Sequence, residues 1–141
     1  MDFLLVAEMA ACCKKQGKTL CDRLHELYME YGYYYDAQAS YKLQGIAGKE
    51  KIQAIMTALR EQKATFIPEP AEVLDFAKGI AGLQATNLLT YKMKNGSWIA
   101  IRPSGTEPKL KMYCSLVEKG EAAAKAKFAA IRERFEQMFA L

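Results

Sequence analysis

The sequence of 141 residues has little histidine, tryptophan, proline or cysteine: one His, one Trp, four Pro and four Cys. Four cysteines with two of them adjacent lack the spacing of a disulfide framework, which favours unpaired thiols in a reducing compartment. No apolar run approaches the ~20 residues that span a bilayer, and no basic segment precedes the apolar opening at residues 3–7. Neither a membrane span nor a signal peptide is predicted, and we expect a cytoplasmic protein.

The net charge is also small, because 20 Lys and Arg residues and 16 Asp and Glu residues give +4. That excess is too small to indicate nucleic-acid binding. Cys12, Cys21 and His25 suggest zinc only weakly, since the paired spacing of zinc ligands is missing. We therefore expect no metal or other cofactor in this chain. The 51% hydrophobic and 26% charged content is that of a globular protein.

The first quarter of the chain has helical patterns. Residues 3–15 have few polar interruptions and predict a helix buried on most sides. Thr19 is placed to cap a second helix whose apolar stripe runs from Leu20 to Tyr31, and Gly32 ends it. The helical period is lost after Gly32, so we place a boundary near Asp36 to Gln38. The predicted domains are residues 1–37 and 38–141.

The rest of the chain alternates between strand and helix patterns. Period-two alternation begins at Ala39 and predicts a strand, and an apolar stripe predicts a helix at 49–62. Four short β-like runs follow at 73–78, 85–94, 98–102 and 110–116, with an Asn95-Gly96 hairpin signal, and a last helix starts near Glu121. This pattern predicts an α+β fold in two layers, with an antiparallel sheet covered by two helices and preceded by two more.

One segment, residues 102–109 (Arg-Pro-Ser-Gly-Thr-Glu-Pro-Lys), differs from ordinary core or surface. Arg102 and Lys109 supply cationic donors, and Ser104 and Thr106 supply hydroxyl and backbone donors suited to an anion. Gly105 is free to adopt a positive φ, which would let successive N–H groups converge on one oxyanion. The alternative is a polar hairpin loop whose residues serve turn geometry alone. Glu107 would repel an anion unless it turns away to pair with Lys109.

This eight-residue segment, followed by Leu-Lys-Met-Tyr, resembles the C-terminal phosphate-binding loop of the phosphohexose mutases, the phosphoglucomutase and phosphomannomutase family. Residues 7–11, 17–20 and 30–34 resemble the end of that family's third domain, and the chain from about Ala39 resembles its fourth. The resemblance implies a fourth domain similar to the TATA-binding-protein type of fold, a sheet covered by two helices.

The resemblance also implies a function. Family members interconvert hexose 1-phosphate and hexose 6-phosphate through a bisphosphorylated intermediate, and their fourth domain holds the phosphate that is not transferred. It implies that Arg102, Ser104, Gly105 and Thr106 contact this phosphate and that Lys109 lies close by. The family's serine, magnesium and sugar loops are absent from this sequence. It therefore resembles a C-terminal fragment, inactive alone, of an enzyme that uses Mg and hexose 1,6-bisphosphate.

The expected partners are a phosphorylated hexose and the remaining domains of the same enzyme, with no nucleic acid and no membrane. Without those domains, the apolar residues of the first helix, such as Phe3 and Leu4, would form a patch that two copies of the chain can bury against each other. The alternative function is a stand-alone module that binds phosphorylated ligands without catalysis.

Overall fold

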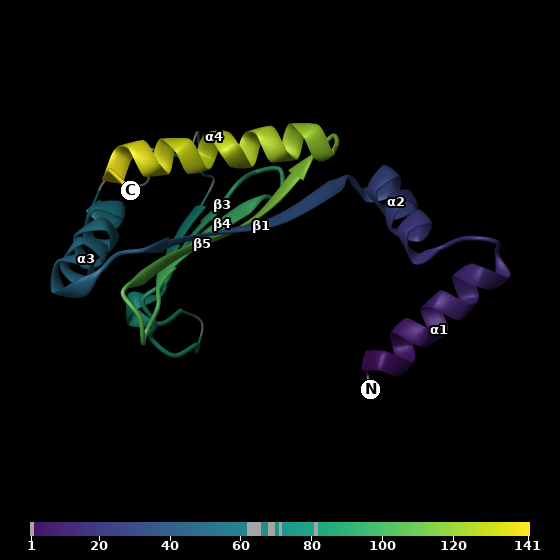
Figure 1. The fold of residues 1–141 in the computed structure, drawn as a ribbon, viewed down its shortest axis with the longest axis horizontal. Helices are drawn as coiled ribbons and strands as arrows, with labels where there is room; N and C mark the ends of the chain where they lie inside the picture. The colour runs from purple at the N-terminus through teal and green to yellow at the C-terminus, as the bar shows by residue number, and fades with distance from the viewer. Residues whose placement is uncertain (1, 62–65, 68–69, 71, 81) are drawn as a thin grey trace. The chain divides into compact units, whose positions relative to one another are not determined.

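The structure is a computed structural model, and it describes residues 2–61, 66–67, 70, 72–80 and 82–141. The chain divides into two compact units between Tyr33 and Tyr34. The first contains two helices. The second contains most of a five-stranded sheet with two long helices, so the α+β class and the antiparallel sheet predicted from sequence are confirmed (Figure 1).

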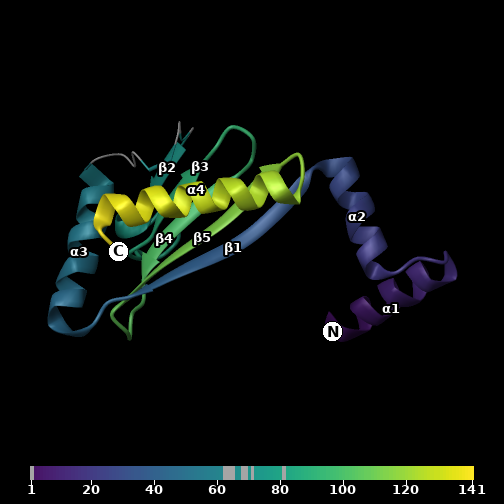
Figure 2. The same cartoon turned by 45° about the horizontal axis from the view of Figure 1, so that its top comes forward.

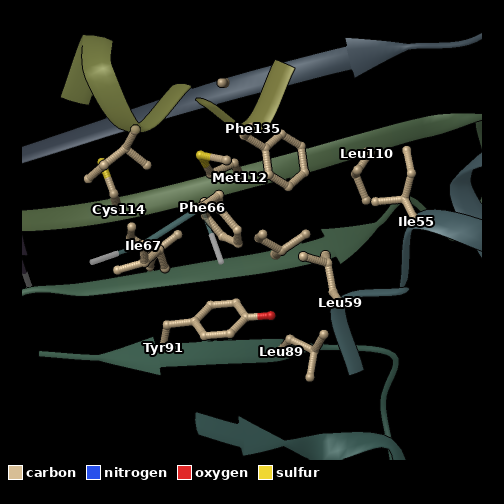
Figure 3. Packing of buried hydrophobic residues seen from close by; sticks show 14 of the residues in the cluster. Ile55, Leu59, Phe66, Ile67, Leu89, Tyr91, Leu110, Met112, Cys114 and Phe135 are labelled. Atoms are coloured by element: carbon tan, nitrogen blue, oxygen red, sulfur yellow. The ribbon is translucent and has the colours of Figure 1, made fainter. Parts of the chain in front are cut away.

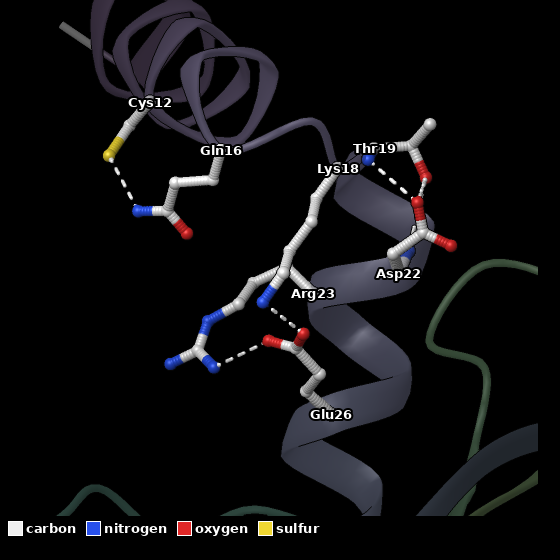
Figure 4. A network of polar contacts seen from close by, with 7 residues as sticks. All are labelled: Cys12, Gln16, Lys18, Thr19, Asp22, Arg23 and Glu26. Carbon is white, nitrogen blue, oxygen red and sulfur yellow. Dashed lines mark hydrogen bonds and ion pairs between the residues drawn. The ribbon is translucent and has the colours of Figure 1, made fainter.

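The first unit consists of α1 (Asp2–Lys15) and α2 (Leu20–Tyr31). Thr19 begins α2 as predicted, since its side chain accepts a hydrogen bond from Asp22 N–H while the Asp22 carboxylate accepts one from Thr19 N–H at 2.7 Å. Glu26 pairs with Lys18 and with Arg23 (Figure 4). These contacts explain why α2 starts where the sequence places it.

The expectation that the first helix is buried on most sides is wrong. Phe3 is 91% exposed and Leu4 is 75% exposed, and among the described residues of α1 only Cys13 is buried. An apolar helix is buried only where another element covers it, and α2 alone is too narrow to cover every side of α1. The first unit therefore presents a largely apolar surface.

The second unit is built on a sheet with strand order β1-β5-β4-β3-β2. Its strands are β1 (Tyr33–Lys42), β2 (Glu72–Asp75), β3 (Leu89–Lys92), β4 (Trp98–Pro103) and β5 (Lys109–Glu118). Pairs β2–β3, β3–β4 and β4–β5 are antiparallel, and β1 runs opposite to β5 at the far edge (Figure 1). The middle strand, β4, is joined to its neighbour β5 by the segment 104–108.

Two helices, α3 (Gly45–Glu61) and α4 (Glu121–Phe139), cover one face of this sheet (Figure 2). Alternate strand residues point to that face, and the register aligns Leu89, Ile101 and Met112 across three strands. Phe66 packs edge-on against both Tyr91 and Phe135 and joins the α4 side of the core to the sheet (Figure 3). No helix in the described part of this unit covers the opposite face, the open face, which includes Arg102 and Lys111.

Several element boundaries differ from those predicted. β1 begins at Tyr33 rather than Ala39, so the predicted boundary at Asp36 to Gln38 falls inside a strand. Three consecutive tyrosines hide the alternation there, because a tyrosine suits either face of a half-buried strand. The assignment of residues 1–37 to a preceding domain remains a prediction.

The region between α3 and β4 contains less strand than predicted. β2 ends at Asp75, whose side chain accepts a hydrogen bond from Ala77 N–H and starts the 3-10 helix Phe76–Lys78, and β3 begins only at Leu89. The hairpin signal at Asn95-Gly96 is confirmed by a turn in which Gly96 has φ 85° and donates to Met93. Helix α3 extends four residues earlier than predicted, and Gln62, its predicted end, lies outside the described residues.

Candidate functional site

The segment 104–108, between Pro103 of β4 and Lys109 of β5, forms a short loop at the end of the β4–β5 hairpin. Ser104 N–H donates to Lys109 O at 2.7 Å and closes its base, and Lys109 N–H donates to Glu107 O at 2.8 Å. Leu43 N–H donates to Pro108 O at 2.9 Å, which ties the loop to the segment between β1 and α3. The loop is therefore held in place by the two strands it connects and by the hydrogen bond from Leu43.

Gly105 does not adopt the positive φ that we expected, so the loop does not form a nest through a left-handed glycine. A Cβ built on Gly105 would meet no atom within 4 Å. Within the described residues, the N–H groups of Gly105 and Thr106 have no acceptor. Neither backbone conformation nor crowding inside the chain explains this glycine, and the space beside it is open to a ligand.

A pocket of about 270 Å³ lies between this loop and the first turns of α3. The loop contributes residues 103–108, and α3 contributes Lys49, Ile52 and Gln53. Ile52 belongs to the core, whereas Lys49 and Gln53 are exposed one helical turn apart. The pocket thus brings together three predicted site residues, Ser104, Gly105 and Thr106, with two helix residues that sequence reasoning missed.

Arg102 and Lys109, the other two predicted site residues, do not line this pocket. Ile101 and Leu110 point into the core, so their strand neighbours Arg102, Lys109 and Lys111 belong to the open face. Arg102 lies directly opposite Lys111 in the register of β4 and β5. The structure therefore places the two predicted cations on one side of the loop and the pocket on the other.

Glu107 pairs with Lys109, with 3.1 Å between Oε2 and Nζ, and it also lines the pocket. The hydrogen bond from Lys109 and the positive charges of Lys109, Lys42 and Lys111 hold the pKa of Glu107 below its ordinary value. The side chain is therefore ionised at neutral pH, where it offsets part of this basic cluster. Lys42 and Lys111 were not identified from the sequence. Lys111 could have been, because it lies two residues after Lys109 in a strand and therefore on the same face of the sheet.

Among the described residues, no group of three or more His, Cys, Asp or Glu is placed to hold a metal ion. The four cysteines are free thiols, with Cys12 and Cys21 exposed and Cys13 and Cys114 buried. Burial raises the pKa of Cys114 to about 11, which makes it a poor nucleophile at neutral pH. No helix in the described ranges is both long and apolar enough to cross a membrane.

Comparison with known proteins agrees with this arrangement of sheet, helices and loop. Residues 49–137 match the family described as "Phosphoglucomutase/phosphomannomutase, C-terminal domain", a range that includes the loop, the residues that line the pocket and most of α4. The chain belongs to the phosphoglucomutase/phosphomannomutase family.

Two curated relatives are phosphoglucomutases of Staphylococcus haemolyticus strain JCSC1435 and Staphylococcus aureus strain MRSA252, 36% and 35% identical over 125 residues. Each match covers 79% of this chain but only 23% and 22% of the relative. A solved structure, the open form of parafusin, a phosphoglucomutase from Paramecium, shares the fold with a TM-score of 0.56 at 16% identity. It is matched over 86% of this chain and 23% of its own length. The chain thus spans less than a quarter of these proteins.

Proposed function

We propose that this chain is the phosphate-anchoring portion of a mutase that interconverts hexose 1-phosphate and hexose 6-phosphate, and that its loop 102–109 holds the phosphate that is not transferred. The observation that carries the proposal is the loop itself. Two unpartnered N–H groups and an uncrowded glycine lie between two hydroxyl side chains, with cations on one side and a pocket on the other.

Each predicted residue has a chemical role in this proposal. Arg102 offers a planar pair of donors to phosphate oxygens, and Lys109 adds positive charge. Ser104 and Thr106 donate hydroxyl hydrogen bonds, and Gly105 lets the phosphate approach its N–H closely. Holding a remote phosphate orients the sugar for a reaction elsewhere, since binding energy far from the reacting bond helps to align the reacting end.

The phosphate site is tested by NMR titration of the whole chain with inorganic phosphate and with glucose 6-phosphate. We expect amide shifts at Ser104, Gly105 and Thr106 and millimolar affinity that weakens with salt. Arg102→Ala should weaken binding several-fold, and Arg102→Lys nearly as much, because lysine cannot reproduce the fork of the guanidinium. Shifts spread over the lysines of α4 instead would show that the anion only samples surface charge.

The isolated chain should have no mutase activity, because an anchor for one phosphate does not supply a nucleophile for the other. A coupled assay with glucose 1-phosphate and its bisphosphate tests this, and turnover that persists through repurification would contradict it. The magnesium and hexose 1,6-bisphosphate of the family belong, in this proposal, to the full-length enzyme.

The second candidate function is a stand-alone phosphate-binding module. The open loop supports a binding module as much as it supports a mutase. Sequence encoded upstream of this chain would distinguish the two functions, because serine and magnesium loops there would establish the enzyme. If the chain is part of a mutase, the remaining domains of the same enzyme cover the apolar surface of α1 and α2. Without those domains, two copies of this chain associate through that surface. The free thiols suit the reducing cytoplasm, where we place the protein.

A further inference from the structure

Among the described residues that line the pocket between the loop and α3, Lys49 of α3 is the only lysine. Lys49 forms no ion pair with any described residue, whereas the neighbouring Lys51 donates to Ala140 O at 2.7 Å. The loop's own Lys109 is paired with Glu107. Lys49 therefore adds a positive charge, with no ion-pair partner among the described residues, to a pocket that Glu107 also lines and whose lining does not include Arg102 or Lys109.

The pocket, of about 270 Å³ and partly open to solvent, leaves room beside a bound phosphate for part of the ligand that carries it. Gln53, one turn beyond Lys49, offers both a donor and an acceptor, which is what a sugar hydroxyl requires.

We propose that Lys49 and Gln53 of α3 complete the binding site of the loop, Lys49 by binding an oxygen of the phosphate and Gln53 by hydrogen-bonding a hydroxyl of the attached sugar. This inference rests on the proposed function of the loop. It makes α3 a part of the ligand site as well as a part of the core, and it identifies the preferred ligand as a phosphorylated polyol rather than free phosphate.

The test compares three variants of the whole chain in the NMR titration, at constant ionic strength. Lys49→Met should weaken binding of both inorganic phosphate and glucose 6-phosphate by about three- to fivefold, the effect of an exposed charge pair. Lys94→Met is the matched control, since it removes the same charge from the β3–β4 turn at the opposite end of β4, and it should change binding by less than about 1.5-fold. Gln53→Leu should weaken binding of glucose 6-phosphate and leave that of phosphate unchanged.

The outcomes separate this inference from the proposed function. Equal losses in Lys49→Met and Lys94→Met, with the shifts at residues 104–106 intact, would overturn the role of Lys49 and leave the loop site standing. Equal losses for both ligands in Gln53→Leu would overturn the hydroxyl contact. If residues 104–106 do not shift in the unmodified chain, the proposed function fails and the inference fails with it. An unchanged amide spectrum elsewhere shows that each variant is folded.

Discussion

Gly105 is the residue whose identity the fold does not require. Its φ is not left-handed and a Cβ there would contact nothing, unlike Gly96, whose φ of 85° strains any other residue. A glycine that neither turn geometry nor packing explains is expected where a ligand approaches the backbone. The same reasoning makes Gly105 a sensitive probe of binding.

We predict that Gly105→Ala leaves the free energy of unfolding unchanged or raises it by up to about 1 kcal/mol, because alanine restricts the unfolded chain. The same change should weaken phosphate binding at least several-fold, since the added methyl occupies the approach to the N–H group. Gly96→Ala should do the reverse, losing about 1–2 kcal/mol while binding is unchanged. Urea unfolding and the phosphate titration measure both effects, and normal binding by Gly105→Ala would contradict the prediction.

At the scale of elements, Arg60 ties α3 to β2, the edge strand opposite β1. Its Nε donates to Asp75 Oδ2 at 3.0 Å, at the end of β2, and its Nη2 donates to Asn87 Oδ1 at 2.7 Å. Burial acts to raise the pKa of Asp75, but the hydrogen bonds from Arg60 and Ala77 N–H, with the charges of Arg60 and Lys78, outweigh it and hold the pKa below its ordinary value. The ion pair therefore favours the folded state when Asp75 is ionised.

The lowered pKa fixes the pH dependence of this contribution. A carboxyl whose pKa is lower in the folded state stabilises above its unfolded pKa of about 3.9 and loses that contribution as the pH falls through the folded value. We predict that Arg60→Met costs about 1 kcal/mol at pH 7, a value limited by the partial exposure of Asp75. The difference from the unmodified chain should shrink below pH 4.

Thermal or urea unfolding at pH 7 and pH 3 measures this difference. Arg134→Met is the control, because Arg134 is exposed on α4 and a substitution there should change stability by less than about 0.5 kcal/mol at either pH. A constant difference between Arg60→Met and the unmodified chain across this pH range would show that packing of the arginine stem, rather than the ion pair, carries the effect.

Elements with strong periodicity were predictable from sequence, and those set by distant partners were not. The stripe of α3 and the Thr19 cap of α2 are local patterns, so both were found. The strand identity of Tyr33 to Gln38 depends on pairing with β5, which lies some 75 residues later, and the segment alone does not show it.

For the site, the loop motif identified its own residues but not their neighbours. Lys49 joins the pocket only through tertiary packing, and nothing in its local sequence distinguishes it from Lys51. Conversely, Arg102 and Lys109 were predicted to act with Ser104, Gly105 and Thr106 because they share one short segment. Strand alternation places Arg102 and Lys109 on the open face, so these two residues do not line the pocket that the other three share.

For the whole molecule, the division between Tyr33 and Tyr34 indicates where the chain can be cut. We predict that a chain of residues 34–141 folds with a thermal midpoint within about 4 °C of the full chain, equivalent to roughly 1 kcal/mol. A chain of residues 38–141 should be less stable, because it loses half of β1 and Tyr35, whose ring packs edge-on to Phe128 with centroids 6.2 Å apart.

The same chains test self-association. Light scattering should show association of the full chain and a monomer for residues 34–141, since only the full chain has the exposed apolar residues of α1. Phe3→Glu with Leu4→Glu in the full chain should restore the monomer without removing the helix. Association of residues 34–141 to the same degree would place the contact on the second unit instead.

The hydrogen bond from Leu43 to Pro108 joins the segment between β1 and α3 to the loop between β4 and β5. Leu43 is in turn pressed against Gly48, where even a Cβ would approach the Leu43 carbonyl carbon to 2.7 Å, and Lys49 follows directly. Leu43 therefore meets the loop at one contact and α3 at another. A displacement of the loop relative to α3 would have to break the hydrogen bond to Pro108 or move Leu43 against Gly48.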